Sequence, residues 1–542
     1  MDSTLQNQIK KVYSNIESRK IRAETLIDLI NNCIQITLDK ETIHSFLDLA
    51  HSQTVVQTIY NADLVTEWLE KLVNLIDISQ FHTGYLLEQR AKRYNKKTVF
   101  NIIRDETIHT VSYADLWKQI IETGKALSTL EKADEFPTIG LLTHNQLNSV
   151  LIDLACLSFG WRVIPIPLNS TSEHLSFILN QSEISHLFVG GKTGIQLWNK
   201  VQPIHKISVI SFSDSESLNG DVISWETFFE SRYDAKNFNA VQRMSYVPMN
   251  ETQTIMYTSG TTANPKGITF TQMNLICKRF ARGLALPEIN ANDCFLCYLP
   301  LFHTFGRYFE LMGSIYWGAT YSFAESPAFN SLLKDFQLIK PSIFISIPKR
   351  WVQLYEMLEE ELDLDSAKDE KINEQLKKVT GGKLTWGLSA AGYLDPDIFL
   401  FYQSHGINIL SGYGMTEATG GITMTPPDDY VKDSVGKALP GLDIKLAGDG
   451  EMLIRGKYIS PGYYKEIESD AFANNWFNTG DIFKEKNGHY FIIDRKKDIY
   501  KNSRGQTIAP QNIENLFQDF DSIKSVFLVG DGKEFNTVLI YP

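Results

Sequence analysis

The sequence predicts an α/β protein with a large N-terminal domain, in which helices flank parallel or mixed sheets, and a small β-subdomain after it. Short apolar runs, each typical of a buried parallel strand, occur at residues 140–143, 162–167, 186–190 and 207–211. Helical stretches such as Leu147 to Phe159 separate them. From Gly436 onward, short alternating strands are divided by Gly and Pro. A chain of 542 residues exceeds one ordinary core, so we expect two or three domains.

Residues 1–78 differ from the rest of the chain and predict a helical extension. They contain no proline and no glycine, and apolar residues recur at helical spacing, as at Leu26, Ile27 and Ile30. No clustered chemistry occurs there, so we interpret the extension as a packing or dimerisation element in preference to a catalytic one. The main domain is expected at 79–495. Residues 496–542 are expected to begin a small, mobile α+β C-terminal domain that is incomplete at Pro542.

The composition narrows the class of protein. The chain is 43% hydrophobic and 21% charged, as in globular proteins, and its net charge of −12 argues against a nucleic-acid binder. No apolar run reaches the length of a membrane span, and the N-terminus lacks a signal-peptide pattern, so we expect a cytoplasmic protein. One C-x-x-C pair, Cys294 and Cys297, cannot complete a tetrahedral metal site.

The segment from Tyr257 to Gly267 is the main candidate for chemistry. Four Ser/Thr hydroxyls, two glycines and Lys266 fall within these eleven positions. Such a loop can surround phosphate oxygens with N–H groups, hydroxyls and one cation. A buried strand is expected before the loop at 253–257, and a helix after it at 273–286 with Thr271 as its cap. The alternative is an ordinary surface turn rich in Ser, Thr and Gly.

The loop resembles the phosphate-binding motif of the adenylate-forming superfamily, which includes acyl-CoA synthetases, luciferases and adenylation domains. Four further motifs follow in that family's order: Leu299-Pro300-Leu301-Phe302-His303, Gly412-Tyr413-Gly414-Met415-Thr416-Glu417, Asn478-Thr479-Gly480-Asp481 and Asp494-Arg495-Lys496-Lys497-Asp498. Several motifs in one order are much more specific than any one of them. The resemblance implies ATP-dependent activation of a carboxylic acid as an acyl-adenylate, then transfer to a thiol, with ATP, Mg²⁺ and CoA as cofactors.

The same resemblance indicates the acid. Residues 299–307, 346–351 and 508–514 look like the long-chain fatty acyl-CoA synthetase branch. A long chain suits an apolar tunnel, because each buried CH₂ contributes about 0.8 kcal/mol. A long-chain fatty acid–CoA ligase is therefore the leading hypothesis, with a fatty acid and CoA as its small-molecule partners.

Residue roles also follow from the resemblance. The polyphosphate and pyrophosphate would be held by Thr258, Ser259, Gly260, Thr261, Thr262 and Lys266. The carboxylate for Mg²⁺ would be Glu417, and Thr416 would contact the α-phosphate. The nucleoside would be bound by Tyr413, Ala390, Ala391 and Gly392 at adenine and by Asp481 and Arg495 at ribose. His303 would gate the acyl pocket, and Lys497 would be the hinge of the C-terminal domain.

Two alternatives stay open. One is a fatty acyl-AMP ligase that loads a carrier-protein phosphopantetheine, and the other is a catalytically silent nucleotide-binding homologue. The family's C-terminal domain carries a lysine that reaches the reacting carboxylate, and no such lysine follows Lys501 at the right distance. We therefore expect either a truncated sequence or a protein without that lysine, with impaired adenylation. Peripheral contact with a membrane is a further expectation.

Overall fold

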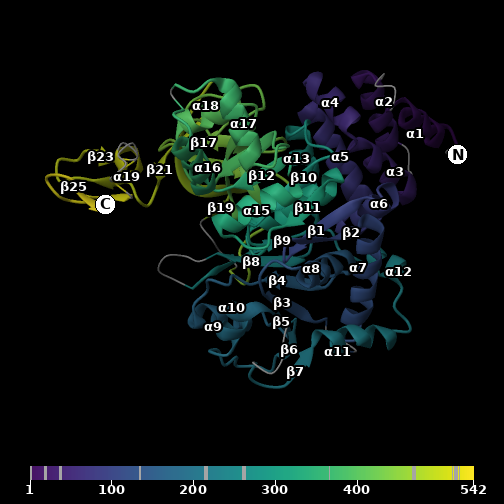
Figure 1. Cartoon of the computed structure of the whole chain (residues 1–542). Coiled ribbons are helices and arrows are strands. Elements are labelled where there is room, and N and C mark those ends of the chain that lie inside the picture. The colour runs from purple at the N-terminus through teal and green to yellow at the C-terminus, as the bar shows by residue number, and fades with distance from the viewer. Residues whose placement is uncertain are drawn as a thin grey trace.

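The computed structural model describes residues 3–16, 21–35, 39–132, 136–212, 218–258, 264–364, 366–466, 471–514, 517, 523 and 525–541. The helical extension lies beside the two large sheets, and the C-terminal piece stands away from them at the end of β21 (Figure 1). No helix in the described part of the chain is long and apolar enough to cross a membrane.

The extension forms five helices, as the spacing of its apolar residues predicts. They are α1 (Ser3–Ile16), α2 (Ala23–Gln35), α3 (Lys40–Ala50), α4 (Gln53–Asn61) and α5 (Val65–Ser79). Trp68, Leu72 and Ile76 lie on one face of α5 and are fully buried. Helices α4 and α5 pack on α13 (Gln272–Ala285), so the extension and the main domain share one hydrophobic core.

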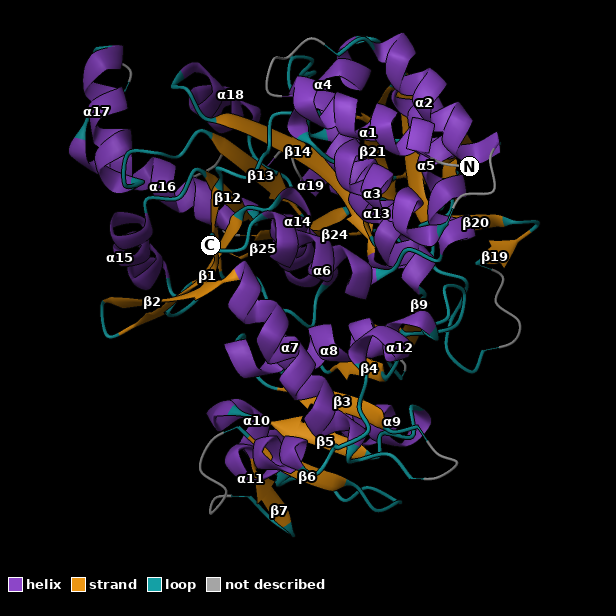
Figure 2. Ribbon diagram, turned by 90° about the vertical axis from the view of Figure 1, so that its right-hand side faces the viewer, coloured by secondary structure: helices purple, strands orange, loops and turns teal. Residues whose placement is uncertain are grey.

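The first large sheet has seven strands in the order β7-β6-β5-β3-β4-β8-β9. All neighbours are parallel except β8 and β9. The strands expected from the apolar runs are present as β3, β4, β5 and β6, and Figure 2 shows this sheet in the lower half with α7 and α8 above it. The bounds are β3 (Thr138–Leu142), β4 (Arg162–Pro165), β5 (His186–Val189), β6 (Ser208–Ser211), β7 (Val222–Ser224), β8 (Thr254–Thr258) and β9 (Lys266–Phe270). The helices around it are α6 (Thr83–Arg93), α7 (Tyr113–Ser128), α8 (Leu147–Phe159), α9 (Ser172–Gln181), α10 (Gly191–Trp198), α11 (Trp225–Glu230), η2 (Ser231–Tyr233) and α12 (Ala240–Ser245).

The second large sheet has nine strands in the order β16-β15-β14-β13-β12-β10-β11-β1-β2. Its central strands are parallel, and antiparallel strands close both edges. The bounds are β1 (Thr98–Arg104), β2 (Thr107–Ser112), β10 (Cys294–Cys297), β11 (Thr320–Phe323), β12 (Ile343–Ser346), β13 (Trp386–Ala390), β14 (Asn408–Met415), β15 (Gly420–Met424) and β16 (Lys437–Ala438). Its connections include a π-helix, η3 (Phe305–Leu311), then α14 (Met312–Trp317), α15 (Phe329–Ile339), α16 (Pro348–Glu361), α17 (Asp369–Val379), α18 (Pro396–Ser404) and η4 (Thr416–Ala418).

The small β-subdomain that the Gly- and Pro-divided strands predict is a five-stranded sheet. It contains β17 (Asp443–Leu446), β18 (Glu451–Arg455), β19 (Phe472–Ala473), β20 (Trp476–Lys486) and β21 (His489–Arg495). Beyond it, two short hairpins and one helix follow: β22 (Tyr500–Lys501), β23 (Thr507–Ile508), α19 (Pro510–Glu514), β24 (Ser525–Val529) and β25 (Thr537–Tyr541).

The structure corrects one local prediction. The loop after β8 does not lead into a helix, because β9 follows it and pairs antiparallel with β8. The two described ends of the phosphate loop, Thr258 and Lys266, are therefore paired in a β-hairpin, and α13 begins only after β9. Gly267 lies within β9, where a Cβ atom would come within 3.0 Å of the Tyr257 ring, so close packing explains this glycine. The helix comes next as α13, and Thr271 caps it in a capping box with Asn274, as predicted.

Candidate active site

The two ends of the phosphate loop lie opposite each other. Thr258 is the last residue of β8, Lys266 is the first of β9, and the two are paired in the sheet. The Lys266 ammonium is 4.6 Å from the centre of the Tyr463 ring and belongs to an exposed side chain. Ser259, Gly260, Thr261 and Thr262, which were predicted to bind phosphate, lie outside the described residues. Among the described residues at the two ends of the loop, Lys266 supplies the positive charge.

Glu417 lies close to this cation. It belongs to the 3₁₀ turn η4, and the Tyr463 hydroxyl donates a hydrogen bond of 2.9 Å to its Oε1. Burial raises the pKa of Glu417, whereas the Tyr463 hydrogen bond and the Lys266 charge act in the opposite direction. The Glu417 carbonyl accepts a 2.7 Å hydrogen bond from the Ser460 N–H. Tyr463 thus contacts both Lys266 and Glu417, and it brings the cation and the carboxylate to one place.

Thr416 precedes Glu417 at the turn between β14 and β15. These strands form an antiparallel hairpin in which Met415 pairs with Gly420. Thr419 has a left-handed φ of 54°, and its hydroxyl donates a 2.6 Å hydrogen bond to the Tyr458 carbonyl. The hairpin tip that carries Thr416 and Glu417 is therefore fixed from outside by residues 458–463.

The residues predicted for adenine come together on two neighbouring strands. Ala390 ends β13 and pairs with Gly412 of β14, which places Tyr413 next to the chain that continues through Ala391 and Gly392. Ala391 has φ of 65°, a left-handed conformation that costs a non-glycine residue about 1 kcal/mol. Strained backbone of this kind often occurs at binding sites. The nearby Ser389 hydroxyl is buried without a hydrogen-bond partner, which leaves a polar atom free for a ligand.

The predicted ribose residues are also adjacent. Asp481 of β20 pairs directly with Arg495 of β21, and their side chains approach to 4.0 Å between Oδ1 and Nε. The Tyr413 hydroxyl donates a 2.5 Å hydrogen bond to Asp481 Oδ2. Burial raises the pKa of Asp481, and the Tyr413 hydrogen bond and the Arg495 charge oppose this. Tyr413 thus joins the predicted adenine and ribose positions.

His303, the predicted gate, is exposed just before the π-helix η3. Its Nδ1 accepts a 3.3 Å hydrogen bond from the Phe305 N–H. Four residues on, Arg307 is fully buried and binds Asp153 of α8 through two hydrogen bonds. A π-helical turn is rare and commonly occurs at functional sites, so the gate segment has an unusual backbone as well as a rigid anchor.

Lys497, the predicted hinge, lies exposed in the turn after β21. Its neighbour Lys496 forms 2.7 Å ion pairs with Asp449 and with Glu451 of the β-subdomain. Asp494, three residues before Lys497, accepts a 2.9 Å hydrogen bond from the Gln511 N–H on the C-terminal side. These contacts hold the turn on both sides, and Lys497 lies exposed between them.

Mg²⁺ is typically bound by one or two carboxylates together with phosphate oxygens. Within the described ranges, no three His, Cys, Asp or Glu side chains come together to hold a metal by themselves. Glu417, a half-buried carboxylate beside the phosphate-loop hairpin, fits a metal that is bound mainly by a polyphosphate. The residues present therefore fit the expected nucleotide and its metal.

Sequence reasoning missed Tyr463 and Asp153. Tyr463 follows the β-subdomain strand β18 and reaches the site because residues 462–464 run beside β9, with Ile268 and Tyr463 forming an isolated bridge. Asp153 is the only charged residue in the largely apolar helix Leu147–Phe159. That exception to the apolar pattern was the available signal for a buried charge with a partner.

Known proteins resemble this chain in sequence and in fold. A protein-family model described as AMP-binding enzyme matches residues 87–464. The chain is 26% identical over 523 residues to a peroxisomal long chain acyl-CoA synthetase 7 of Arabidopsis thaliana, covering 86% of this chain and 73% of the relative. It is 27% identical over 487 residues to the human long-chain-fatty-acid–CoA ligase 1, covering 79% and 69%. The solved structure of o-succinylbenzoate CoA synthetase from Bacillus subtilis with its acyl-adenylate shares the fold, with a TM-score of 0.66 and 20% identity over 84% of this chain and 88% of that one.

Proposed function

Because the chain belongs to the family of AMP-binding enzymes, we propose that it activates a long-chain fatty acid with ATP and transfers the acyl group to CoA. Membership makes the chain an AMP-forming acyl-CoA synthetase, an acid–thiol ligase. The long-chain acid is supported by the names of its relatives and by the apolar side chains of Leu299, Phe309 and Leu311, which belong to the main hydrophobic core. We also propose a cytoplasmic location.

The reaction needs two substitutions. A carboxylate oxygen of the acid attacks the α-phosphorus of ATP, and the bond to the pyrophosphate oxygen breaks. The CoA sulfur then attacks the acyl carbon, AMP leaves with the bonding electrons, and the thiol proton goes to solvent. Because the charge is mainly on phosphate oxygens, the protein contributes chiefly by positioning and by charge neutralisation.

The residues divide this work by location. Lys266, with Thr258 opposite it, would bind the departing pyrophosphate. Glu417 would hold Mg²⁺, which when bound withdraws charge from the phosphate oxygens. Asp481 and Arg495 would fix the ribose, and Tyr413 the adenine. The observation that carries the proposal is that Tyr463 contacts both Lys266 and Glu417.

The test is acid-dependent release of pyrophosphate from ATP, measured with hexadecanoate, benzoate and an amino acid, with and without CoA. We expect release with hexadecanoate, and Lys266→Ala or Glu417→Ala should slow it by roughly 100-fold or more, the scale of one lost electrostatic contact in a transition state. Lys334→Ala and Glu106→Ala are the matched controls, since these two form an exposed ion pair elsewhere on the surface. Unchanged release in the Glu417→Ala enzyme at saturating Mg²⁺ would refute the assignment.

A further inference from the structure

Helix α13 carries three basic residues that the fold places in its interior. Lys278, Arg279 and Arg282 are 0%, 2% and 3% exposed. Arg282 lies one turn from both others, so the three side chains share one side of the helix. Every residue of α13 except Ala285 is buried, which leaves these cations no route to bulk water along the helix.

None of the described residues supplies a counter-charge to this group. The three side-chain nitrogens of Arg279, and Nε and Nη1 of Arg282, are buried without a hydrogen-bond partner. The hydroxyls of Tyr308, Tyr316 and Tyr458 interact with these charges, and burial raises the pKa of each hydroxyl, so they stay neutral at neutral pH. Burial lowers the pKa of Arg282 to about 9, so the guanidinium still carries its charge at neutral pH.

Arg307 shows that a buried arginine in this protein can have a carboxylate partner. Arg307 is equally buried and has Asp153 as its partner. A buried charge without a partner costs several kcal/mol as an order of magnitude. Two such guanidinium groups on one helix therefore indicate that an anion completes the group when the protein works.

The position of Arg282 connects the group with the acyl side of the site. Its guanidinium carbon is 4.0 Å from the centre of the Phe309 ring, in the π-helix that follows His303. On the other side, Cβ atoms built at Gly420 and Gly421 would come within 3.4 Å and 3.3 Å of Nη2. These glycines pair with Met415 and Gly414, directly before Thr416 and Glu417. Arg282 thus lies between the gate segment and the hairpin that carries the predicted phosphate contacts.

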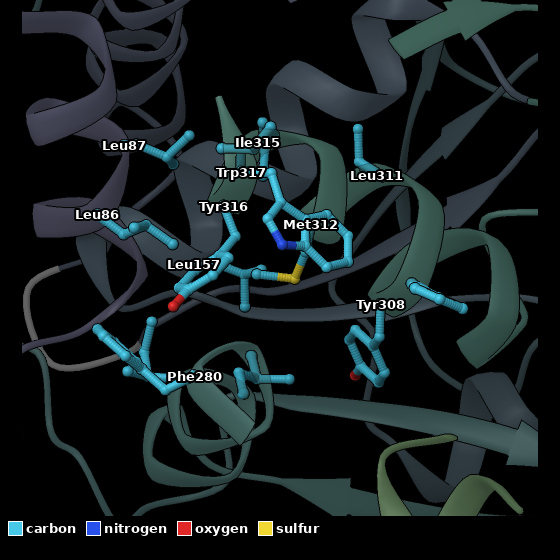
Figure 3. Packing of buried hydrophobic residues seen from close by; sticks show 14 of the residues in the cluster. Leu86, Leu87, Leu157, Phe280, Tyr308, Leu311, Met312, Ile315, Tyr316 and Trp317 are labelled. Atoms are coloured by element: carbon cyan, nitrogen blue, oxygen red, sulfur yellow. The ribbon is translucent and has the colours of Figure 1, made fainter. Parts of the chain in front are cut away.

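Arg279 extends the same group toward α14. Its charge interacts with Tyr308 of η3 and Tyr316 of α14. Figure 3 shows Phe280 of α13 on the side of Tyr316, and the centres of these two rings are 5.3 Å apart. Lys278 donates a hydrogen bond to the Gly421 carbonyl of the β14–β15 hairpin and lies 4.0 Å from the Tyr458 ring centre. Lys278 therefore supports the hairpin, and the two arginines are the unpaired cations.

We propose that Arg279 and Arg282 bind a second carboxylate on the acid substrate, so that the enzyme prefers α,ω-dicarboxylic acids to monocarboxylic acids of the same length. This rests on the proposed function, because it assumes that the acyl chain enters between η3 and the β14–β15 hairpin. Guanidinium groups bind carboxylates through two parallel hydrogen bonds, and both arginines have unused donors. The second carboxylate neutralises the buried charge, and a methyl terminus leaves it unpaired.

The first experiment uses the unmodified protein. We expect kcat/KM for pyrophosphate release to be at least tenfold higher with hexadecanedioic acid than with hexadecanoic acid, or with decanedioic than with decanoic acid. Without ATP, the favoured diacid should also raise the melting temperature of the protein more than its monoacid does. A preference for the monoacid at both lengths would overturn the inference and leave the proposed function intact.

The second experiment uses Arg282→Met and Arg279→Met. Replacing an uncompensated buried cation by an apolar side chain removes a desolvation cost, so the melting temperature without substrate should stay equal or rise. The ratio of diacid to monoacid kcat/KM should fall at least tenfold. Arg282→Lys keeps the charge but loses the planar fork and should give an intermediate ratio. Exposed Arg104→Met is the control and should leave the ratio unchanged.

Two outcomes separate this inference from the proposed function. If neither kind of acid releases pyrophosphate, the proposed function fails, and the melting-temperature comparison of diacid with monoacid still decides the inference. If the methionine variants melt at lower temperature and lose both acids equally, the arginines are structural and the inference is wrong.

Discussion

Replacing Arg307 by methionine should destabilise the region where the gate segment meets the seven-stranded sheet. Its Nε donates a 2.8 Å hydrogen bond to Asp153 Oδ2 and its Nη2 a 2.5 Å bond to Oδ1, while Nη1 donates at 2.9 Å to the Thr254 hydroxyl. The two side chains of the ion pair are 0% and 6% exposed. The Asp153 carboxylate raises the pKa of Arg307 despite the burial of the guanidinium, so Arg307 is charged at neutral pH.

The size of the effect follows from this burial. Loss of one partner leaves the other charge without compensation, which costs about 3–5 kcal/mol. The double variant Arg307→Met with Asp153→Leu replaces the pair by apolar side chains and should recover most of that loss, because buried ion pairs and apolar replacements are often similar in stability.

Native-state hydrogen exchange measures this loss locally, which suits a chain of this size better than a single unfolding transition. Backbone amides of α8 and β8 that exchange when this region unfolds should do so roughly 100-fold to several thousand-fold faster in Arg307→Met, because about 1.4 kcal/mol corresponds to a tenfold change in rate. Amides of the β-subdomain serve as the internal control. If the exchange rates of the α8 amides stay within about fivefold of those in the unmodified protein, the ion pair stabilises the fold no more than an exposed pair does, and the reasoning is refuted.

Four further predictions concern the site itself. Tyr463→Phe removes a hydrogen bond that lowers the pKa of Glu417, so that pKa should rise, and the acid limb of the pH–rate profile for Mg²⁺-dependent pyrophosphate release should move to higher pH; an unmoved limb would count against the contact. Asp481→Ala should abolish the preference for ATP over 2′,3′-dideoxy-ATP in initial rates, and a retained preference would make Asp481 a turn residue only. Lys497→Pro fixes φ and should spare one half-reaction while slowing the other, as measured by separate assays of pyrophosphate release and thioester formation; an equal loss in both places the hinge elsewhere. Ala391→Gly relieves a φ of 65° and should raise the melting temperature, by an amount worth about 1 kcal/mol, and a lower melting temperature would contradict the strain.

Much of the architecture was predictable because it depends on local pattern. Continuous apolar runs gave the buried parallel strands β3, β4, β5 and β6, and Thr271 marked the start of α13. The pairing of Thr258 with Lys266 was not predicted. Strand β9 has only five residues, and its two buried apolar side chains, Ile268 and Phe270, are too few to establish an alternation.

The parts of the site that escaped prediction depend on distant residues. Tyr463 contacts Lys266 and Glu417 only because residues 462–464 pair beside β9, and no short-range pattern reports such a pairing. The burial of Arg279 and Arg282 was also hidden, since a Lys-Arg pair on a helix ordinarily marks a solvated face. Helices α4 and α5 of the extension, together with α6 and α14, cover this helix.

The core shared by the extension and α13 has a consequence for biosynthesis. Helices α4 and α5 leave the ribosome well before their partner α13, so the face that they pack against it stays uncovered until α13 is made. During that interval the nascent chain displays an apolar surface that chaperones recognise, and its maturation should depend on them. Deletion of the extension should have a related effect. A product that begins after Ser79 would expose the α13 surface that the extension normally covers, and it should aggregate instead of yielding a smaller enzyme.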